Sequence, residues 1–162
     1  MKLNLTPIRK PIYNFNASYT KENEVITMCY ILYGSVNNGI NMQDYKKAVG
    51  ELPYDFQAGN EDDINRCIAE ETYKYRITYN DCDCDTPVGG HDADNEKLKA
   101  FAGLLDRLRD VRGIKYVMLS KNWTGEENEK SITVHIQDTD IVKMLADAEE
   151  KCLYRIELYR KY

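Results

Sequence analysis

Residues 72 to 80 read TYKYRITYN, and this stretch decides the fold because its side chains alternate strictly. Aromatic and aliphatic side chains occupy the odd positions from 73 to 79, and charged or polar ones occupy the even positions. A period of two residues is typical of a β-strand with one buried and one solvated face. The stretch therefore predicts a half-buried strand.

The chain on the C-terminal side of this strand alternates between helical and extended patterns. Leu98, Phe101, Leu105 and Leu108 recur at helical spacing, and CLYRIELYRKY at the chain's end alternates like a strand. The predicted elements are a strand at 72–80, a helix at about 95–112, strands at 114–120 and 131–137, a helix capped by Asp138, and a final strand within 152–162. This β-α-β-β-α-β order predicts a ferredoxin-like fold, a four-stranded antiparallel sheet with two helices on one face. Helix continuation is the alternative for the last segment.

The N-terminal part predicts a second group of elements. Residues 1–22 have the composition of an irregular arm, and the apolar run 24–34 is typical of a strand covered on both faces. A helix capped by Asn41 and a second helix over about 61–71 follow. We predict an α+β protein with residues 1–71 as an arm plus a β-α-α extension and 72–162 as the ferredoxin-like domain, together one compact unit. The extension is expected to lengthen the sheet or to cap its open face.

Composition narrows the class of protein. The longest apolar runs are well below the roughly 18 to 20 residues needed to span a bilayer, and MKLNLTPIRKPIYNFN lacks the apolar region of a secretory signal. The five cysteines are an odd, scattered set, which favours reduced thiols over a disulfide framework. We therefore expect a cytoplasmic protein without a membrane segment.

Acidic residues are concentrated in two connections. The segment NDCDCDTPVGGHDADNE, residues 80–96, carries six acidic side chains, and the connection 121–130 carries three more. A strand–helix–strand crossover makes the strands that precede these connections parallel, so both connections should meet at one edge of the sheet. We call these nine side chains the acidic pole: Asp81, Asp83, Asp85, Asp92, Asp94, Glu96, Glu126, Glu127 and Glu129.

The rest of the chain is net positive. Of its 27 acidic residues nine lie in the acidic pole, whereas all 22 lysines and arginines lie outside 80–96 and 122–129. The formal net charge of −5 therefore conceals a segregated distribution, and such a field attracts cations or basic partner surfaces.

A divalent cation is one ligand that this loop suggests. Asp81, Asp83, Asp85 and Asp92 fall at positions 1, 3, 5 and 12 of an EF-hand-like register, which suits Ca²⁺ or Mg²⁺. However, Thr86 stands where such a loop needs glycine, and a strand precedes the loop. Clustered carboxylates can also hold the ions of metal-dependent catalysis. The alternative function is a divalent-metal-dependent phosphoester hydrolase or nucleotidyl enzyme that uses residues 81–94, with Glu126 or Glu127 as a further ligand.

Thiolate chemistry and helix capping are competing interpretations of the same loop. Cys82, Cys84 and His91 supply three soft ligands, but a second thiol pair, as zinc sites usually have, is missing. Either Asp92 or Asp94 is expected to cap the helix that starts near residue 95, which explains one acid without any binding role. His135 lies on the polar side of its strand and is expected to be a surface histidine.

Recognition of a basic protein surface accounts for most of the acidic pole. Spaced carboxylates resemble a row of phosphates, and Trp123, the only tryptophan, is suited to anchoring an interface. Its alternative role is a ring folded over the sheet.

We predict a non-enzymatic protein-binding module without a cofactor, an inhibitor of the anti-defence or anti-CRISPR kind from a phage or other mobile element. Its partner is a nucleic-acid-binding protein with a basic surface. Direct nucleic-acid binding through the acidic pole is disfavoured, and a homodimer formed through sheet faces or edges is a further alternative. The binding residues are expected to be Asp81, Asp83, Asp85, Asp92, Trp123, Glu126, Glu127 and Glu129.

Overall fold

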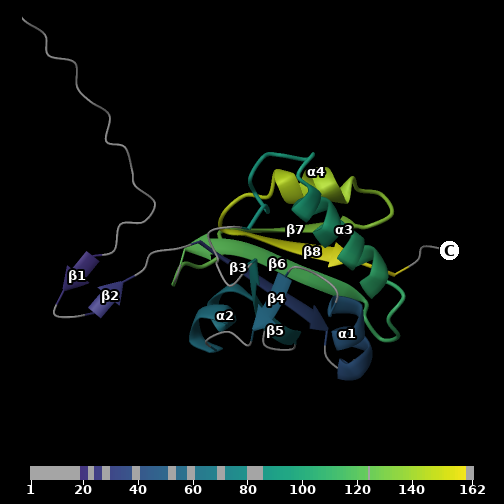
Figure 1. Ribbon diagram of the computed structural model, residues 1–162, viewed down its shortest axis with the longest axis horizontal. Coiled ribbons are helices and arrows are strands. Elements are labelled where there is room, and N and C mark those ends of the chain that lie inside the picture. The colour runs from purple at the N-terminus through teal and green to yellow at the C-terminus, as the bar shows by residue number, and fades with distance from the viewer. Residues whose placement is uncertain are drawn as a thin grey trace, which may run out of the picture.

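The protein is an α+β structure with a mixed sheet (Figure 1). The computed structural model describes residues 19–21, 24–26, 30–37, 41–50, 54–57, 61–68, 72–79, 86–123 and 125–159. Its helices are α1 (Met42–Val49), α2 (Glu61–Cys67), α3 (Glu96–Leu108) and α4 (Ile141–Ala146). Its strands are β1 (Tyr19–Lys21), β2 (Glu24–Ile26), β3 (Tyr30–Asn37), β4 (Tyr54–Gln57), β5 (Thr72–Tyr79), β6 (Tyr116–Trp123), β7 (Lys130–His135) and β8 (Cys152–Glu157).

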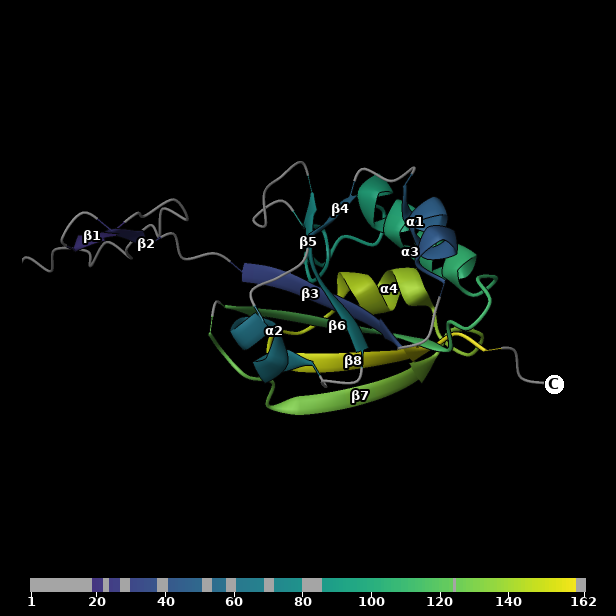
Figure 2. The same ribbon diagram turned by 90° about the horizontal axis from the view of Figure 1, so that it is seen from below.

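Six of the strands form one sheet in the order β4-β5-β3-β6-β8-β7. All neighbouring pairs are antiparallel except β7 and β8, which are parallel. Strands β1 and β2 pair only with each other, antiparallel, within the described residues. In Figure 2, β7 lies at one margin of the six-stranded sheet.

The ferredoxin-like topology is not confirmed. Strand β3, from the N-terminal part of the chain, lies in the middle of the sheet between β5 and β6, instead of extending it or capping a face. Strand β8 lies between β6 and β7, so the connection 124–129 does not close a β-hairpin. Because the parallel β7–β8 pair needs α4 as its crossover, the predicted order of elements is compatible with this different sheet. The final segment is a strand, as predicted.

Helices cover both faces of the sheet. Helices α1, α3 and α4 contribute to one large core cluster, in which Phe101, Leu105 and Leu145 pack against Leu32 and Ile156 of the sheet. Helix α2 and the residue that follows it contribute Ile64, Cys67 and Ile68 to a smaller cluster on the other face. Figure 1 shows α3 and α4 above the strands and α2 below them. The buried strand β3 agrees with the predicted strand covered on both faces from residue 30 onward. Residues Glu24–Ile26 of the same apolar run instead form β2, which pairs with β1.

The predicted N-cap residue is correct for one helix and wrong for two. Asn41 caps α1 by accepting the backbone N–H of Gln43 at 2.9 Å, as predicted. Helix α3 is capped by Asn95, not by Asp92 or Asp94, and α4 by Asp140, not Asp138. In each case the cap is the residue directly before the first helical turn, where its side-chain oxygen reaches free N–H groups.

Asn37 ends β3, and its side chain bonds to the backbone that leads into β6. Its side chain donates to the Gly113 carbonyl and accepts from the Lys115 backbone N–H, each at 2.7 Å. These bonds fix the entry to β6 against the end of β3. Among the described residues, the chain has no helix with the length and apolarity required to cross a membrane.

Candidate functional site

Two connections meet at one edge of the sheet, as the sequence predicted. Ile77 of β5 and Lys121 of β6 both align with Leu32 of β3, and both strands run antiparallel to β3. Strands β5 and β6 are therefore parallel, and their carboxyl ends reach the same edge. The described part of the loop after β5 packs there, since the backbone N–H of Gly89 donates to the Leu145 carbonyl at 2.8 Å.

The structure describes only some of the acidic residues in the loop after β5. Asp81, Asp83 and Asp85 lie outside the described residues, as do Cys82 and Cys84. Asp92 is exposed, and its carboxylate accepts the backbone N–H of Asp94 at 3.0 Å, which shapes the turn before α3. Within the described residues, Asp92 thus has a local structural role.

Lysines lie among the glutamates at this edge, which the sequence analysis did not expect. Lys151, at the start of β8, bridges Glu126 at 3.2 Å and Glu129 at 3.3 Å. Hydrogen bonds to these two carboxylates raise the pKa of Lys151. Lys130 likewise pairs with Glu149. The surface is therefore mixed in sign and more rigid than a row of free carboxylates.

Two glutamates that the sequence analysis missed also lie here. Glu149 and Glu150 follow α4, whose C-terminal end faces this edge, and both are exposed. The signal available was the EEK triplet directly before the final strand, but it required knowing that β8 starts beside the end of β6.

These residues make up a single charged and aromatic surface. We call it the Trp123 patch, and it consists of Tyr30, Lys121, Trp123, Glu126, Glu127, Glu129, Lys130, Glu149, Glu150 and Lys151. Five glutamates and three lysines leave it net negative. It shares Trp123, Glu126, Glu127 and Glu129 with the predicted binding set.

An aromatic pair lies within the Trp123 patch. Tyr30 and Trp123 are directly opposite in the β3–β6 register, and their ring centroids are 4.0 Å apart at an interplanar angle of 43°. Burial, followed by a hydrogen bond to Glu150, raises the pKa of Tyr30. Both rings remain half-buried. Trp123 therefore packs on a neighbouring ring while keeping part of its surface open, which combines features of the two predicted roles.

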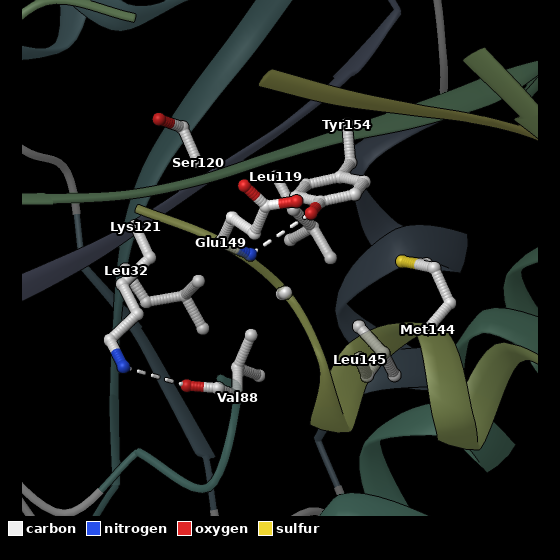
Figure 3. Close-up of a pocket in the computed structure, with 10 residues that line it drawn as sticks. Leu32, Val88, Leu119, Ser120, Lys121, Met144, Leu145, Glu149 and Tyr154 are labelled. Atoms are coloured by element: carbon white, nitrogen blue, oxygen red, sulfur yellow. Dashed lines mark hydrogen bonds between the residues drawn. The ribbon is translucent and has the colours of Figure 1, made fainter. Parts of the chain in front are cut away.

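Lys121 connects this surface to the loop after β5. Its Nζ donates to the Val88 carbonyl at 3.1 Å (Figure 3). The same Nζ lies 5.3 Å from the Tyr30 ring centroid. Burial lowers the pKa of Lys121, and the charge of Glu150 opposes that effect. Lys121 thus joins the loop, the aromatic pair and the acidic rim.

The cavity beneath Lys121 is too small for a substrate. Figure 3 shows Val88, Leu145 and Tyr154 around it, and its volume is about 10 Å³, the space of a single water molecule. A second cavity of similar size lies among α1, α3 and the sheet. Neither one has the several hundred Å³ typical of small-molecule sites.

A buried polar network holds the described connection 125–129 in place. The side chain of Asn122 is fully buried. Its amide nitrogen donates to the Cys67 sulfur and to Asn128 Oδ1, each at 3.2 Å. Its Oδ1 accepts the Lys151 backbone N–H at 3.0 Å. Asn128 in turn donates to the Cys67 carbonyl at 2.6 Å. The network ties the connection to both α2 and the start of β8.

The described residues do not form a metal site. No group of three or more His, Cys, Asp or Glu side chains among them is arranged to hold an ion. His91 is exposed and lies 3.4 Å from Asp147. His135, expected at the surface, is buried beside Tyr159, with ring centroids 4.8 Å apart. Metal binding by Asp81, Asp83 and Asp85, which lie outside the described residues, stays a prediction.

Comparison with known proteins yields no relative. The chain matches no family model, no curated protein and no solved structure. A function must therefore be inferred from the geometry of the Trp123 patch.

Proposed function

We propose that this protein binds another protein through the Trp123 patch and does not itself catalyse a reaction. The observation that carries the proposal is the half-buried Tyr30–Trp123 pair set among five glutamates. Interface hot spots are enriched in tryptophan and tyrosine surrounded by a polar rim, and this arrangement matches that pattern.

The charge of the patch indicates the chemistry of the partner. Glu127 is exposed and has no ion pair within the described residues, and Glu129 and Glu150 are exposed as well. A net negative rim favours a basic surface and steers its approach over long distances. We propose that the partner is a nucleic-acid-binding protein, which the carboxylates engage in place of phosphates. An inhibitor of a defence complex, made by a phage or other mobile element, is the most concrete form of this proposal.

Pre-organisation supports binding through this surface. Lys151 is an ion-pair partner of both Glu126 and Glu129, and the buried Asn122 network fixes the connection that carries them. A surface that is ordered before binding loses less conformational entropy when it binds. The free, buried thiol of Cys152 is compatible with the proposed cytoplasmic location.

A pull-down from bacterial lysate tests the proposal. The protein is immobilised as the natural chain and as the Glu127→Lys and Trp123→Ala variants, and Asp106→Asn on the exposed face of α3 serves as a control outside the patch. We expect the natural chain and Asp106→Asn to retain the same protein and both patch variants to lose it. Added duplex DNA should release the captured protein, because both ligands compete for one basic surface. Equal capture by all four chains, or capture that DNA does not affect, would overturn the proposal.

A further inference from the structure

Strand β7 forms one margin of the sheet, and within the described residues its outer side is unpaired. Strand β7 ends the order β4-β5-β3-β6-β8-β7, and no other described element lies beyond it (Figure 2). Two hydrogen bonds show which backbone groups face β8. The Lys130 N–H donates to the Lys151 carbonyl at 3.3 Å, and the Ile136 N–H donates to the Glu157 carbonyl at 3.0 Å. Because successive residues of a strand point in opposite directions, the backbone groups of Ser131 and Thr133 and the N–H of His135 point outward.

This edge lacks the features that normally prevent strand pairing. Proteins protect edges with proline, bulges, inward charges or very short strands. Strand β7, sequence KSITVH, is six residues long, pairs with β8 in continuous register and has Lys130 as its single lysine, at its first position. The β-branched residues Ile132, Thr133 and Val134 at its centre favour pairing.

We propose that two copies of this chain pair through β7, antiparallel and about a twofold axis at Thr133. The outward-pointing residues Ser131, Thr133 and His135 are spaced symmetrically about that axis, so every one of them meets an outward-pointing residue of the second copy. A twofold axis at Thr133 also keeps α3 and α4 of both copies on the same face of a continuous sheet.

The side chains are compatible with this register. Ile132 faces Val134 of the second copy, and both are partly exposed apolar residues at the margin of the large core. Thr133 faces its own equivalent, a favourable cross-strand pair. No like charges are opposite each other.

His135 also takes part in this register. Its Nδ1 accepts the Gln137 backbone N–H at 3.2 Å, so Nε2 carries the proton in the neutral ring. Nε2 is buried and has no hydrogen-bond partner among the residues that the structure describes. The proposed register brings the Ser131 hydroxyl of the second copy beside this ring.

The pairing should be weak. A single pair of six-residue strands buries less than the roughly 1,200 Å² of stable interfaces. We therefore expect a dissociation constant of about 10 to 100 µM. Sedimentation of the natural chain should therefore show the 18.8 kDa monomer at low concentration and twice that mass as the concentration approaches about 1 mM.

A charge exchange at position 133 tests the register. Thr133 is exposed, so Thr133→Lys and Thr133→Glu should both fold, as circular dichroism would verify. Each variant alone faces its own charge across the twofold axis, and its dissociation constant should rise at least tenfold. An equimolar mixture of the two variants should restore the dimer, whereas Thr133→Val should dimerise like the natural chain.

Three outcomes would overturn the proposal. The first is a natural chain that stays monomeric at about 1 mM, which would leave the edge to a strand of another protein. The second is undiminished dimerisation of both charged variants. The third is a mixture that does not restore the dimer. None of these results depends on the partner of the Trp123 patch, so the two proposals are tested separately.

Discussion

The Asn122 side chain donates a hydrogen bond to the Cys67 sulfur, 3.2 Å away, where β6 meets α2. This contact joins residues 55 positions apart and belongs to the network that also holds Asn128 and the Lys151 backbone. It links the smaller core cluster to the connection that carries Glu126 and Glu129. The stability of α2 and the shape of the Trp123 patch are therefore coupled.

Replacing Asn122 with alanine should destabilise the protein by about 2 to 3 kcal/mol, because several buried polar groups lose their partner at once. Urea unfolding followed by circular dichroism measures the change. Gln43→Ala, at an exposed position of α1, is the control and should change the free energy of unfolding by less than about 0.5 kcal/mol. A loss for Asn122→Ala no larger than for the control would contradict the role of the network.

Two glycines should respond in opposite directions to alanine. Gly89 has a φ of +71°, and an added Cβ would lie 2.6 Å from the Ala148 carbonyl oxygen, so Gly89→Ala should destabilise the protein by about 1 to 3 kcal/mol. Gly103 lies in α3 with no atom within 4 Å of such a Cβ, so Gly103→Ala should stabilise it by up to about 1 kcal/mol. Thermal unfolding of both variants tests this, and equal shifts for the two would contradict it.

Stability should decrease in the alkaline range because of Tyr75. Burial raises the pKa of Tyr75 to about 12, and the pKa of the stacked Tyr45 is raised as well, also mainly by burial. Above the ordinary tyrosine pKa of about 10, the unfolded chain has lost protons that the folded protein keeps. Rising pH therefore favours the unfolded state between about pH 10 and about pH 12.

Urea midpoints between about pH 9 and about pH 11.5 measure this effect. Tyr75→Phe should flatten the decrease, because phenylalanine has no proton to lose, while the exposed Tyr159→Phe should not. If both variants follow the pH dependence of the natural chain, burial of Tyr75 does not cause it.

Local patterns predicted the elements, but not their neighbours. The alternation around Tyr75 and the cap at Asn41 depend on residues close in sequence, and both agree with the structure. The insertion of β3 and β8 between strands that are adjacent in sequence depends on long-range pairing, such as Leu32 with both Ile77 and Lys121. Alternation alone carries no information on such pairing.

The candidate site likewise combines residues that the sequence could place with residues that only the strand pairing places. Glu126, Glu127 and Glu129 lie at the predicted edge because β5 and β6 are parallel, which the crossover helix dictates. Lys151 and Glu149 were missed because they join this edge only through the pairing of β8 with β6. Asp92 accepts the Asp94 backbone N–H in the turn before α3, and its predicted contact with a partner stays a prediction.

The central claim is that the Trp123 patch is the partner-binding surface. Because Trp123 is the only tryptophan, a chain labelled with fluorotryptophan gives one fluorine NMR signal that reports on this patch alone. The protein recovered in the pull-down, purified and unlabelled, is titrated into it. We predict that the signal shifts or broadens in a saturable way, that Glu127→Lys prevents the change, and that duplex DNA reverses it. A complex that forms by sedimentation while the Trp123 signal stays unchanged would contradict the claim.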